Sequence, residues 1–511
     1  MTTSNSNILA CNHKEFLDSL PIALEKARAD GGIPGMSVAI RYKGELVFAQ
    51  GFGKRNRNDP FTKETVSHVA SVTKAFTATV IGELVAEGKV DWSTTPVSHY
   101  LPEFELKDPV LTSQLTFADM LSHRTPLPPV DIAWFRNELP LRVLINQLKH
   151  LDFPSKMSPY LNYNNAMYAV AGEAAANVAG LSFADLMKTK IFEPLGLKDA
   201  GLSMAEMAKR PNYAMPYDAA SFEDAQKGIY EEGYVDEIPM TDAPGRDVYI
   251  NVVDLVKWGS VIMKEGELDG KHVLNKESIL ETLKAHNIVE QGRRRRDFSP
   301  TLGYGLGWGL DTYKGHTIVY HDGNNPGYRS NVAFFPDDDL VIAVLTNIHV
   351  TDFPSSLPFY IADGLLSLPR TENWINEYSI KQTQETYEGY KSRNKIPVRI
   401  VDKPYGRDLT DYAGDYNHPV FGKITISLQD DGALHLKMRT LEGKLEHHHY
   451  ESFMGVFHEF AMRGSFFFTF ITGSKGSVEA AEVILPLDGT PKRFSKTETP
   501  KSKKVAPVKE E

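Results

Sequence analysis

Segments with the spacing of strands and of helices are unevenly distributed over residues 15–345. Alternating apolar residues predict a β-hairpin at residues 36–49, with its turn at Lys43-Gly44. Strand-like runs return only at 317–320, 331–335 and 340–345, and helical spacing lies between and before the strands, at 15–28, 71–90, 115–123, 168–178 and 252–264. Because strands come from both ends of this stretch, we expect one mixed sheet built from both ends and covered by helices.

The apolar period changes to two beyond residue 420. Two alternating runs, 424–428 and 434–438, flank the turn Asp430-Asp-Gly432, and further strands are predicted at 457–462 and 465–470. This predicts a separate small antiparallel β-barrel. The expected organisation is a disordered start (1–12), a first domain (13–368), a polar linker (369–405), the β domain (406–496) and a disordered tail (497–511).

Composition excludes several classes of protein. A net charge of −10 argues against nucleic-acid binding. The single cysteine, Cys11, rules out an internal disulfide, and neither a secretory signal nor an apolar stretch long enough to span a membrane is present, which favours a cytoplasmic location. The arginine run 293–296 fits a solvated loop. The histidines at 447–449 and 458 make a poor metal site, because neighbouring strand residues point to opposite faces, so we expect no metal or cofactor.

A serine and a lysine three residues apart begin the predicted helix at residues 71–90. At a helix start this spacing puts Lys74 beside the Ser71 hydroxyl, which becomes a good nucleophile only when a base takes its proton. Lys74 must then be neutral, as burial or a nearby cation would make it. The same spacing occurs at Ser392 and Lys395 in the expected linker. Alone, the motif fits a plain N-cap serine better than a nucleophile.

A second motif, Tyr163-Asn-Asn165, precedes the predicted helix at 168–178. A tyrosine relays protons when a cation lowers its pKa, and Lys74 is a candidate for that cation. An asparagine side chain holds both a lysine and a substrate carbonyl. Tyr-x-Asn also begins at Tyr160 and Tyr249, so this motif too is weak by itself.

A third motif, His321-Asp-Gly323, follows the predicted strand at 317–320. Gly323 permits close approach of the backbone to a ligand. The backbone N–H groups of Asn324 and Ser71 are candidates for an oxyanion hole. In isolation, a strand-end histidine before an Asp-Gly turn explains the segment equally well.

In order and spacing, the three motifs together resemble those of the serine β-lactamase, penicillin-binding-protein and esterase superfamily, in particular its class C-like members. The resemblance covers residues 15–365 and extends to Ile33–Gly35, Leu121–Thr125, Phe192–Leu197, Tyr304–Trp308 and Val344–Asn347. It implies an α+β, transpeptidase-like fold with an antiparallel sheet flanked by helices and a helical subdomain. Tyr412–Tyr416 resembles part of the lipocalin-like appendage of some peptidases and esterases in this superfamily.

The resemblance also implies roles for individual residues. Ser71 matches the acylated nucleophile, Lys74 the general base and Tyr163 the residue that shares proton transfer. Tyr163 is preferred to Tyr160 because it stands five residues before the next aromatic, Tyr168, as the family's tyrosine does. The substrate-binding positions that match are Asn165, His321 and Gly323, together with Asn324.

The sequence departs from many β-lactamases and transpeptidases at His321, where they carry a lysine. A lysine is cationic and binds a substrate carboxylate, whereas a histidine is mostly neutral at pH 7, and Asp322 adds negative charge nearby. We therefore expect a hydrolase or acyltransferase for a less anionic ester or amide, with or without a second acyl acceptor. The alternatives are a D-amino-acid-specific peptidase or amidase, a β-lactamase, and a non-catalytic binding protein of the same fold.

Overall fold

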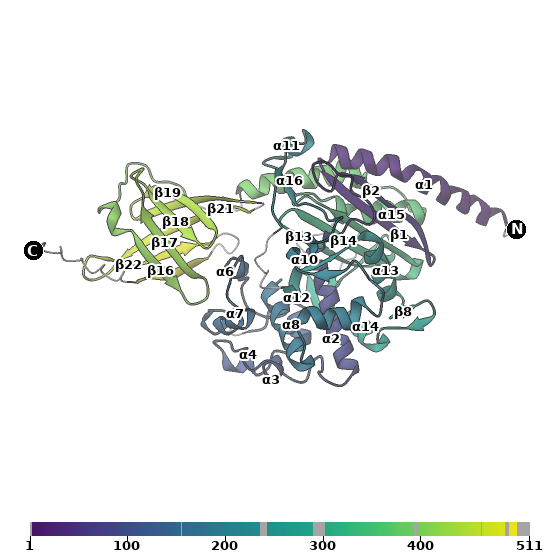
Figure 1. The fold of residues 1–511 in the computed structure, drawn as a ribbon, viewed down its shortest axis with the longest axis horizontal. Helices are drawn as coiled ribbons and strands as arrows, with labels where there is room; N and C mark the ends of the chain where they lie inside the picture. Colours follow the sequence, from purple (N-terminus) through teal and green to yellow (C-terminus); the bar gives the residue numbers. More distant parts are fainter. Residues whose placement is uncertain are drawn as a thin grey trace, which may run out of the picture. The chain divides into compact units, whose positions relative to one another are not determined.

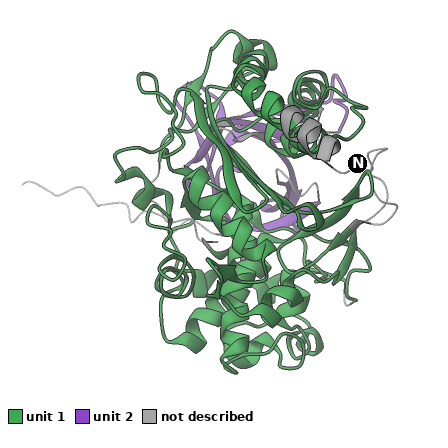
Figure 2. Cartoon of the chain, turned by 90° about the vertical axis from the view of Figure 1, so that its right-hand side faces the viewer, with its two compact units in different colours: residues 1–391 green, residues 392–511 purple. Residues whose placement is uncertain are grey.

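The computed structural model describes residues 3–154, 156–235, 243–289, 302–392, 397–460, 462–485 and 490–497. The chain divides into two compact units, residues 1–391 and residues 392–511, which Figure 2 shows in two colours. No helix in these described ranges is long and apolar enough to cross a bilayer.

Unit 1 is built around one eight-stranded sheet in the order β10-β11-β12-β13-β14-β15-β1-β2 (Figure 1). The N-terminal strand β1 pairs with the late strand β15, with Val38 opposite Val344, which confirms a sheet assembled from both ends. All of its ladders are antiparallel, so the expectation of a mixed sheet was wrong. The strands are β1 (Gly35–Tyr42), β2 (Glu45–Gly53), β10 (Asn287–Val289), β11 (Leu302–Tyr304), β12 (Gly309–Tyr313), β13 (His316–Asn325), β14 (Tyr328–Phe335) and β15 (Leu340–Thr346).

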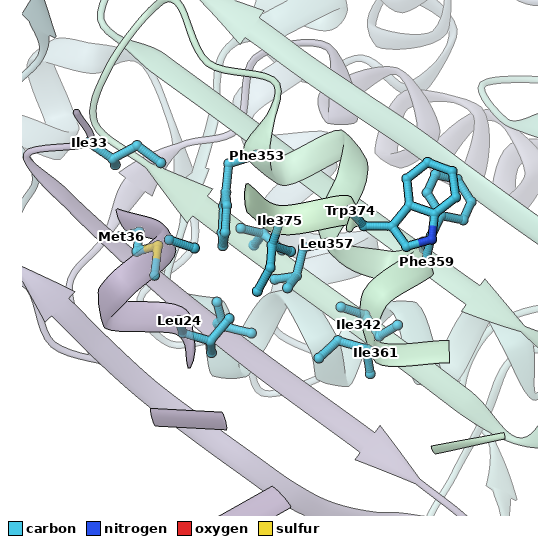
Figure 3. Close-up of a cluster of buried hydrophobic side chains, with 14 of the residues drawn as sticks. Leu24, Ile33, Met36, Ile342, Phe353, Leu357, Phe359, Ile361, Trp374 and Ile375 are labelled. Atoms are coloured by element: carbon cyan, nitrogen blue, oxygen red, sulfur yellow. The ribbon is translucent and has the colours of Figure 1, made fainter. Parts of the chain in front are cut away.

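Helices cover both faces of this sheet. On one face, α1 (Thr3–Asp30), α15 (Phe353–Leu365) and the single turn η6 (Trp374–Tyr378) bury apolar side chains against β1 and β15 (Figure 3). On the other face, α13 (Val252–Met263) packs so closely that a Cβ on Gly259 would lie 2.9 Å from Val341. Ile342 belongs to the first core and Val341 faces α13, because successive strand residues point to opposite faces.

Helices also occur in the expected disordered start and in the helix-compatible segment that was expected to be a linker. Helix α1 begins at Thr3, because the buried positions Phe16 and Leu20 anchor a helix that continues into the polar start of the chain. Residues 374–392 of the expected linker form η6 and α16 (Ser379–Ser392). Trp374 is buried in the core of unit 1. The mostly polar composition of the segment gave no sign of this buried residue.

The helices that carry the motifs differ from prediction at their starts. The predicted helix at 71–90 is a short 3₁₀ turn, η1 (Ala70–Val72), followed by α2 (Thr73–Ala86). The helix predicted at 168–178 is α8 (Asn165–Ala179), which begins earlier because the Asn164 side chain caps it by accepting the Met167 N–H. The helix predicted at 115–123 shortens to α5 (Phe117–Leu121), which has a capping box formed by Thr116 and Asp119.

Unit 2 is a closed antiparallel barrel in which each strand pairs with the next and β16 pairs with β23. The predicted strand at 457–462 was wrong, because β20 ends at Glu459 and β21 begins at Met462, so a hairpin turn falls inside it. Aromatic rings fill the interior, with Tyr412 4.9 Å from Phe453 and 4.8 Å from Phe470 between centroids. The strands are β16 (Gly414–His418), β17 (Gly422–Leu428), β18 (Leu434–Met438), β19 (Leu441–His449), β20 (Ser452–Glu459), β21 (Met462–Thr472), β22 (Val478–Ile484) and β23 (Pro491–Thr497).

A buried carboxylate ties three elements of unit 1 together, and its removal should be costly. Asp363 of α15 accepts hydrogen bonds from the Tyr313 hydroxyl, from Lys314 Nζ at 2.7 Å and from the Trp374 indole N–H. We predict that Asp363→Ala lowers the free energy of unfolding by about 3–5 kcal/mol, because it strands a mostly buried ammonium group. Urea titration followed by tryptophan fluorescence measures this, since all five tryptophans lie in unit 1.

The control for this prediction is Glu385→Ala, which removes an exposed partner of Lys381 on α16. That change should cost less than about 1 kcal/mol. Equal, small losses for the two variants would contradict the structural role of Asp363.

Candidate active site

Ser71 stands at the turn between strand β3 (Ser67–His68) and helix α2. Ala70 has a positive φ of 48°, which turns the chain sharply into η1. Strand β13 packs against this turn so tightly that a Cβ on Gly323 would lie 2.1 Å from the Val69 carbonyl oxygen and 2.2 Å from Ser330 Oγ. The close approach expected at Gly323 is therefore to the chain's own backbone. It sets the distance between β13 and the Ser71 turn.

Lys74 lies one turn into the helical segment and is fully buried. Its Nζ lies 3.1 Å from Ser71 Oγ, 2.7 Å from Asn165 Oδ1 and 2.8 Å from the Gly245 carbonyl oxygen. Gly245 belongs to α12 (Ala243–Arg246). The structure thus brings the expected serine, lysine and asparagine into one hydrogen-bonded group.

Tyr163 joins this group from the loop before α8. Lys74 Nζ lies 4.8 Å from the centroid of the Tyr163 ring, and the Ser71 hydroxyl is near enough to the Tyr163 hydroxyl to affect its pKa. Although the residue is 36% exposed, burial of the hydroxyl raises its pKa well above the usual value, and Ser71 offsets this only in part. The expectation that Lys74 lowers this pKa was wrong, because the Lys74 amino group faces the ring. Tyr163 is therefore a neutral phenol at pH 7.

The two other Tyr-x-Asn matches lie in different surroundings. Tyr160 is 49% exposed on the loop, and Tyr249 lies in β7 (Val248–Ile250) opposite His68.

Asn165 is fixed at both ends of its amide. Its Oδ1 accepts from Lys74, and its Nδ2 donates to the carboxylate of Asp131 at the start of α6 (Asp131–Trp134). Arg246 pairs with the same Asp131 oxygen at 3.2 Å. Asp131 and Arg246 were not predicted, because no sequence pattern marks an isolated loop acid or arginine.

His321 lies inside β13, not at a strand end as expected, because the strand continues to Asn325 in register with β14. Its Nδ1 donates to the Asp322 carbonyl oxygen at 2.6 Å, so its Nε2 accepts from the Tyr304 hydroxyl at 3.0 Å. Burial, and then Lys74, lower the His321 pKa to about 4, so the ring is neutral near pH 7. The Asp322 carboxylate is held by Asn331 and Ser355.

Aromatic side chains beside Lys74 were not predicted to belong to the site. The His123 ring is fully buried, its centroid lies 4.2 Å from that of Tyr163, and its Nδ1 accepts the Asn164 N–H. Burial, followed by the charge of Lys74, holds the His123 pKa well below its usual value. His123 and Tyr304 both fall in segments that carried the family resemblance, and this was the available signal.

Asn324 follows Gly323 on β13, and its side chain is exposed. Other candidates from the sequence lie apart from this group. His447 and His448 bond separately to the carbonyl oxygens of Tyr450 and Pro397, and the described residues contain no cluster of three His, Cys, Asp or Glu suited to a metal. The arginine run 293–296 and the side chains of Cys11, Ser392, Lys395 and His458 lie outside the described residues.

Comparison with known proteins assigns the family. Residues 22–365 match the family model described as Beta-lactamase, so the chain belongs to the Beta-lactamase family. Residues 399–496 match a second model, described as a domain of unknown function (DUF3471).

Individual relatives are distant but extensive. The chain is 27% identical to "Unguisins hydrolase ungD'" of Aspergillus campestris over 77% of this chain and 74% of the relative. It is 26% identical to "Penicillin-binding protein 4" of Amycolatopsis lactamdurans over 63% of this chain and 82% of that protein. The octameric penicillin-binding protein homologue from Pyrococcus abyssi has a similar fold, with a TM-score of 0.57 and 21% identity over 94% of this chain and 99% of that one.

The depressed His321 pKa predicts a pH dependence of stability. Between pH 6.5 and about pH 4 the unfolded chain binds a proton at this histidine that the folded chain does not, so the free energy of unfolding should fall as the pH falls. The contribution is on the order of 1–3 kcal/mol. Urea unfolding of the wild type and of His321→Gln at pH 7 and pH 5 should show the smaller pH effect in the variant.

The control is His272→Gln on the exposed hairpin β8 (Glu267–Leu268) and β9 (Lys271–His272), which should keep the wild-type pH effect. An unchanged pH effect in His321→Gln would contradict the depressed pKa.

Proposed function

We propose that the chain is a serine hydrolase that cleaves an ester or amide through an acyl-enzyme on Ser71. The observation that carries this proposal is the 3.1 Å contact between Ser71 Oγ and the fully buried Lys74 Nζ. A hydrolase is favoured over a transferase because two of the relatives are named unguisins hydrolases. It is favoured over a binding protein because all three motifs meet at one site: Ser71, Lys74 and Asn165 share hydrogen bonds, and β13 packs against the Ser71 turn at Gly323.

The neighbours of Lys74 favour its role as the base. Asn165 Oδ1 and the Gly245 carbonyl oxygen can only accept hydrogen bonds. In a neutral lysine the two N–H groups donate hydrogen bonds to these two oxygens. The nitrogen lone pair is then available to accept a hydrogen bond from the Ser71 hydroxyl. The unprotonated amine is thereby aimed at the Ser71 hydroxyl, which has a proton to give.

The reaction proceeds in two balanced halves. In acylation Ser71 Oγ bonds to the substrate carbonyl carbon, the serine proton passes to Lys74, and the carbon–oxygen or carbon–nitrogen bond of the leaving group breaks. The neutral Tyr163 phenol donates a proton to the departing group and regains one from Lys74. In deacylation water bonds to the acyl carbon, the Ser71 bond breaks, and the proton released by water returns to the serine oxygen.

Backbone groups stabilise the tetrahedral intermediates. The N–H groups of Ser71 and Asn324 are the proposed oxyanion donors, and Gly323 holds β13 close enough to the Ser71 turn to supply the second one. Asn165 is proposed to bind the substrate amide through Nδ2, which has a second hydrogen beyond the one given to Asp131.

The first test is loss of the nucleophile. Turnover of a chromogenic ester should fall by at least about 10³-fold in Ser71→Ala, because no other group forms the acyl-enzyme. Ser392→Ala removes the serine of the other Ser-x-x-Lys segment and should keep wild-type turnover. Activity that survives in Ser71→Ala would exclude the proposed mechanism, and a panel containing D-aminoacyl anilides and β-lactams tests the alternative substrates.

The second test concerns substrate charge. Because His321 is neutral, the wild type should prefer an uncharged ester to a matched ester that carries a carboxylate. In His321→Lys the ratio of kcat/KM for the anionic ester to that for the neutral ester should rise by about tenfold, as expected for one added charge interaction. His321→Gln should leave this ratio unchanged.

Because the ratio is taken within each variant, it does not depend on the fraction that folds. An unaltered ratio in His321→Lys would show that the side chain at position 321 does not interact with the charged group of the substrate.

A further inference from the structure

A third buried histidine, His68, lies next to the Ser71 turn and has no part in the chemistry proposed above. His68 is fully buried on β3, and its Nδ1 accepts the backbone N–H of Ala70 at 3.2 Å. Asn325 Nδ2 lies 3.2 Å from the same nitrogen. Ala70 is the residue whose positive φ presents Ser71.

The Ala70 bond fixes the tautomer of this histidine. A backbone N–H only donates, so His68 Nδ1 must be unprotonated and the ring proton must be on Nε2. Nε2 lies 3.6 Å from Asp247 Oδ1, and Asp247 is also buried. Within the described residues neither of these two atoms has a hydrogen-bond partner, so the charge of Asp247 is the feature that turns the Nε2–H toward it.

The segment that carries Asp247 also holds the catalytic group in place. Gly245, two residues earlier, accepts from Lys74, and Val248, one residue later, accepts the Val69 N–H at 2.9 Å. One short stretch of chain thus contacts the lysine, the histidine and the backbone before Ser71.

The strain at Ala70 explains why such support is needed. A non-glycine residue at positive φ is strained and persists only where its surroundings hold it. Val69 is held on both sides, through its N–H by Val248 and through its carbonyl by Ser330 Oγ. The Ala70 N–H is held by the His68 side chain.

We propose that His68, oriented by Asp247, is a positioning residue that holds the Ala70 turn so that Ser71 meets Lys74 and the oxyanion donors. This inference rests on the proposed function, because its consequence is a rate of acylation. It adds a buried Asp–His pair that acts on the nucleophile through the backbone and never touches the substrate.

Two substitutions of His68 separate its two nitrogens. In His68→Asn the side-chain oxygen falls near the position of Nδ1, so the Ala70 N–H keeps an acceptor while the group facing Asp247 is lost. In His68→Gln the longer amide reaches toward Asp247 and the Ala70 N–H loses its acceptor. We expect kcat to fall about 10- to 100-fold in His68→Gln, the loss typical of a buried unpaired donor, with KM within about twofold of the wild type.

His68→Asn should retain kcat within about fivefold of the wild type. All rates are expressed per Ser71 that reacts with a fluorophosphonate, so partial unfolding does not enter the comparison. Equal losses in the two variants, or a loss confined to KM, would overturn the inference.

The role of Asp247 is tested by a double-mutant cycle. Asp247→Val should lower kcat in the wild-type background and have no further effect in the His68→Asn background, where no ring remains to be oriented. Additive losses would show that Asp247 acts independently of His68.

Amide hydrogen exchange of the segment containing Ala70 separates this inference from the proposed function. Exchange should be faster in His68→Gln than in the wild type and His68→Asn. If the wild type shows neither ester turnover nor Ser71 labelling, the proposed function fails, whatever the exchange result. If the wild type is active and exchange is the same in all three proteins, the positioning role fails alone.

Discussion

The hydrogen bonding of the buried Lys74 amino group is the interaction on which the rest of the site depends. A buried amino group without partners is costly, so the fold must deliver partners to it from distant parts of the chain. Ser71, Asn165 and Gly245 do so from η1, α8 and α12. A Cβ on Gly307 would lie 2.8 Å from the Lys74 carbonyl oxygen, so the loop after β11 packs directly against the backbone of α2 at Lys74. The packing of these elements therefore supplies the hydrogen-bond partners of Lys74 in addition to forming an apolar core.

The neutral histidines around Lys74 follow from the same constraint. His123 and His321 are both buried, and burial and then the nearby lysine hold both pKa values down. Neither histidine ring therefore carries a positive charge near pH 7, and Lys74 Nζ lies over the rings of Tyr163 and Tyr168. This supports the proposed preference for a substrate without a carboxylate.

Much of this arrangement could be predicted from sequence, because it depends on local order. The spacing of Ser71 and Lys74 predicts their contact within one turn, and the strand patterns predicted a sheet built from both ends of the domain, but not its antiparallel order or the strands β10, β11 and β12. Other features depend on packing between distant segments, which no local pattern reports: the buried Trp374 in a polar stretch, the Asp131 partner of Asn165, and the raised Tyr163 pKa. The continuation of β13 through His321 was hidden by its Asp-Gly sequence, which favours a turn in isolation.

The central claim is that Ser71 carries the acyl group. The most direct measurement is to quench the reaction with an activated ester in acid within the first turnover, digest the protein and locate the added mass by tandem mass spectrometry. The account predicts a stoichiometric acyl group on Ser71 that disappears on a timescale matching kcat. An acyl group on another residue, or turnover with no covalent intermediate on any residue, would contradict it.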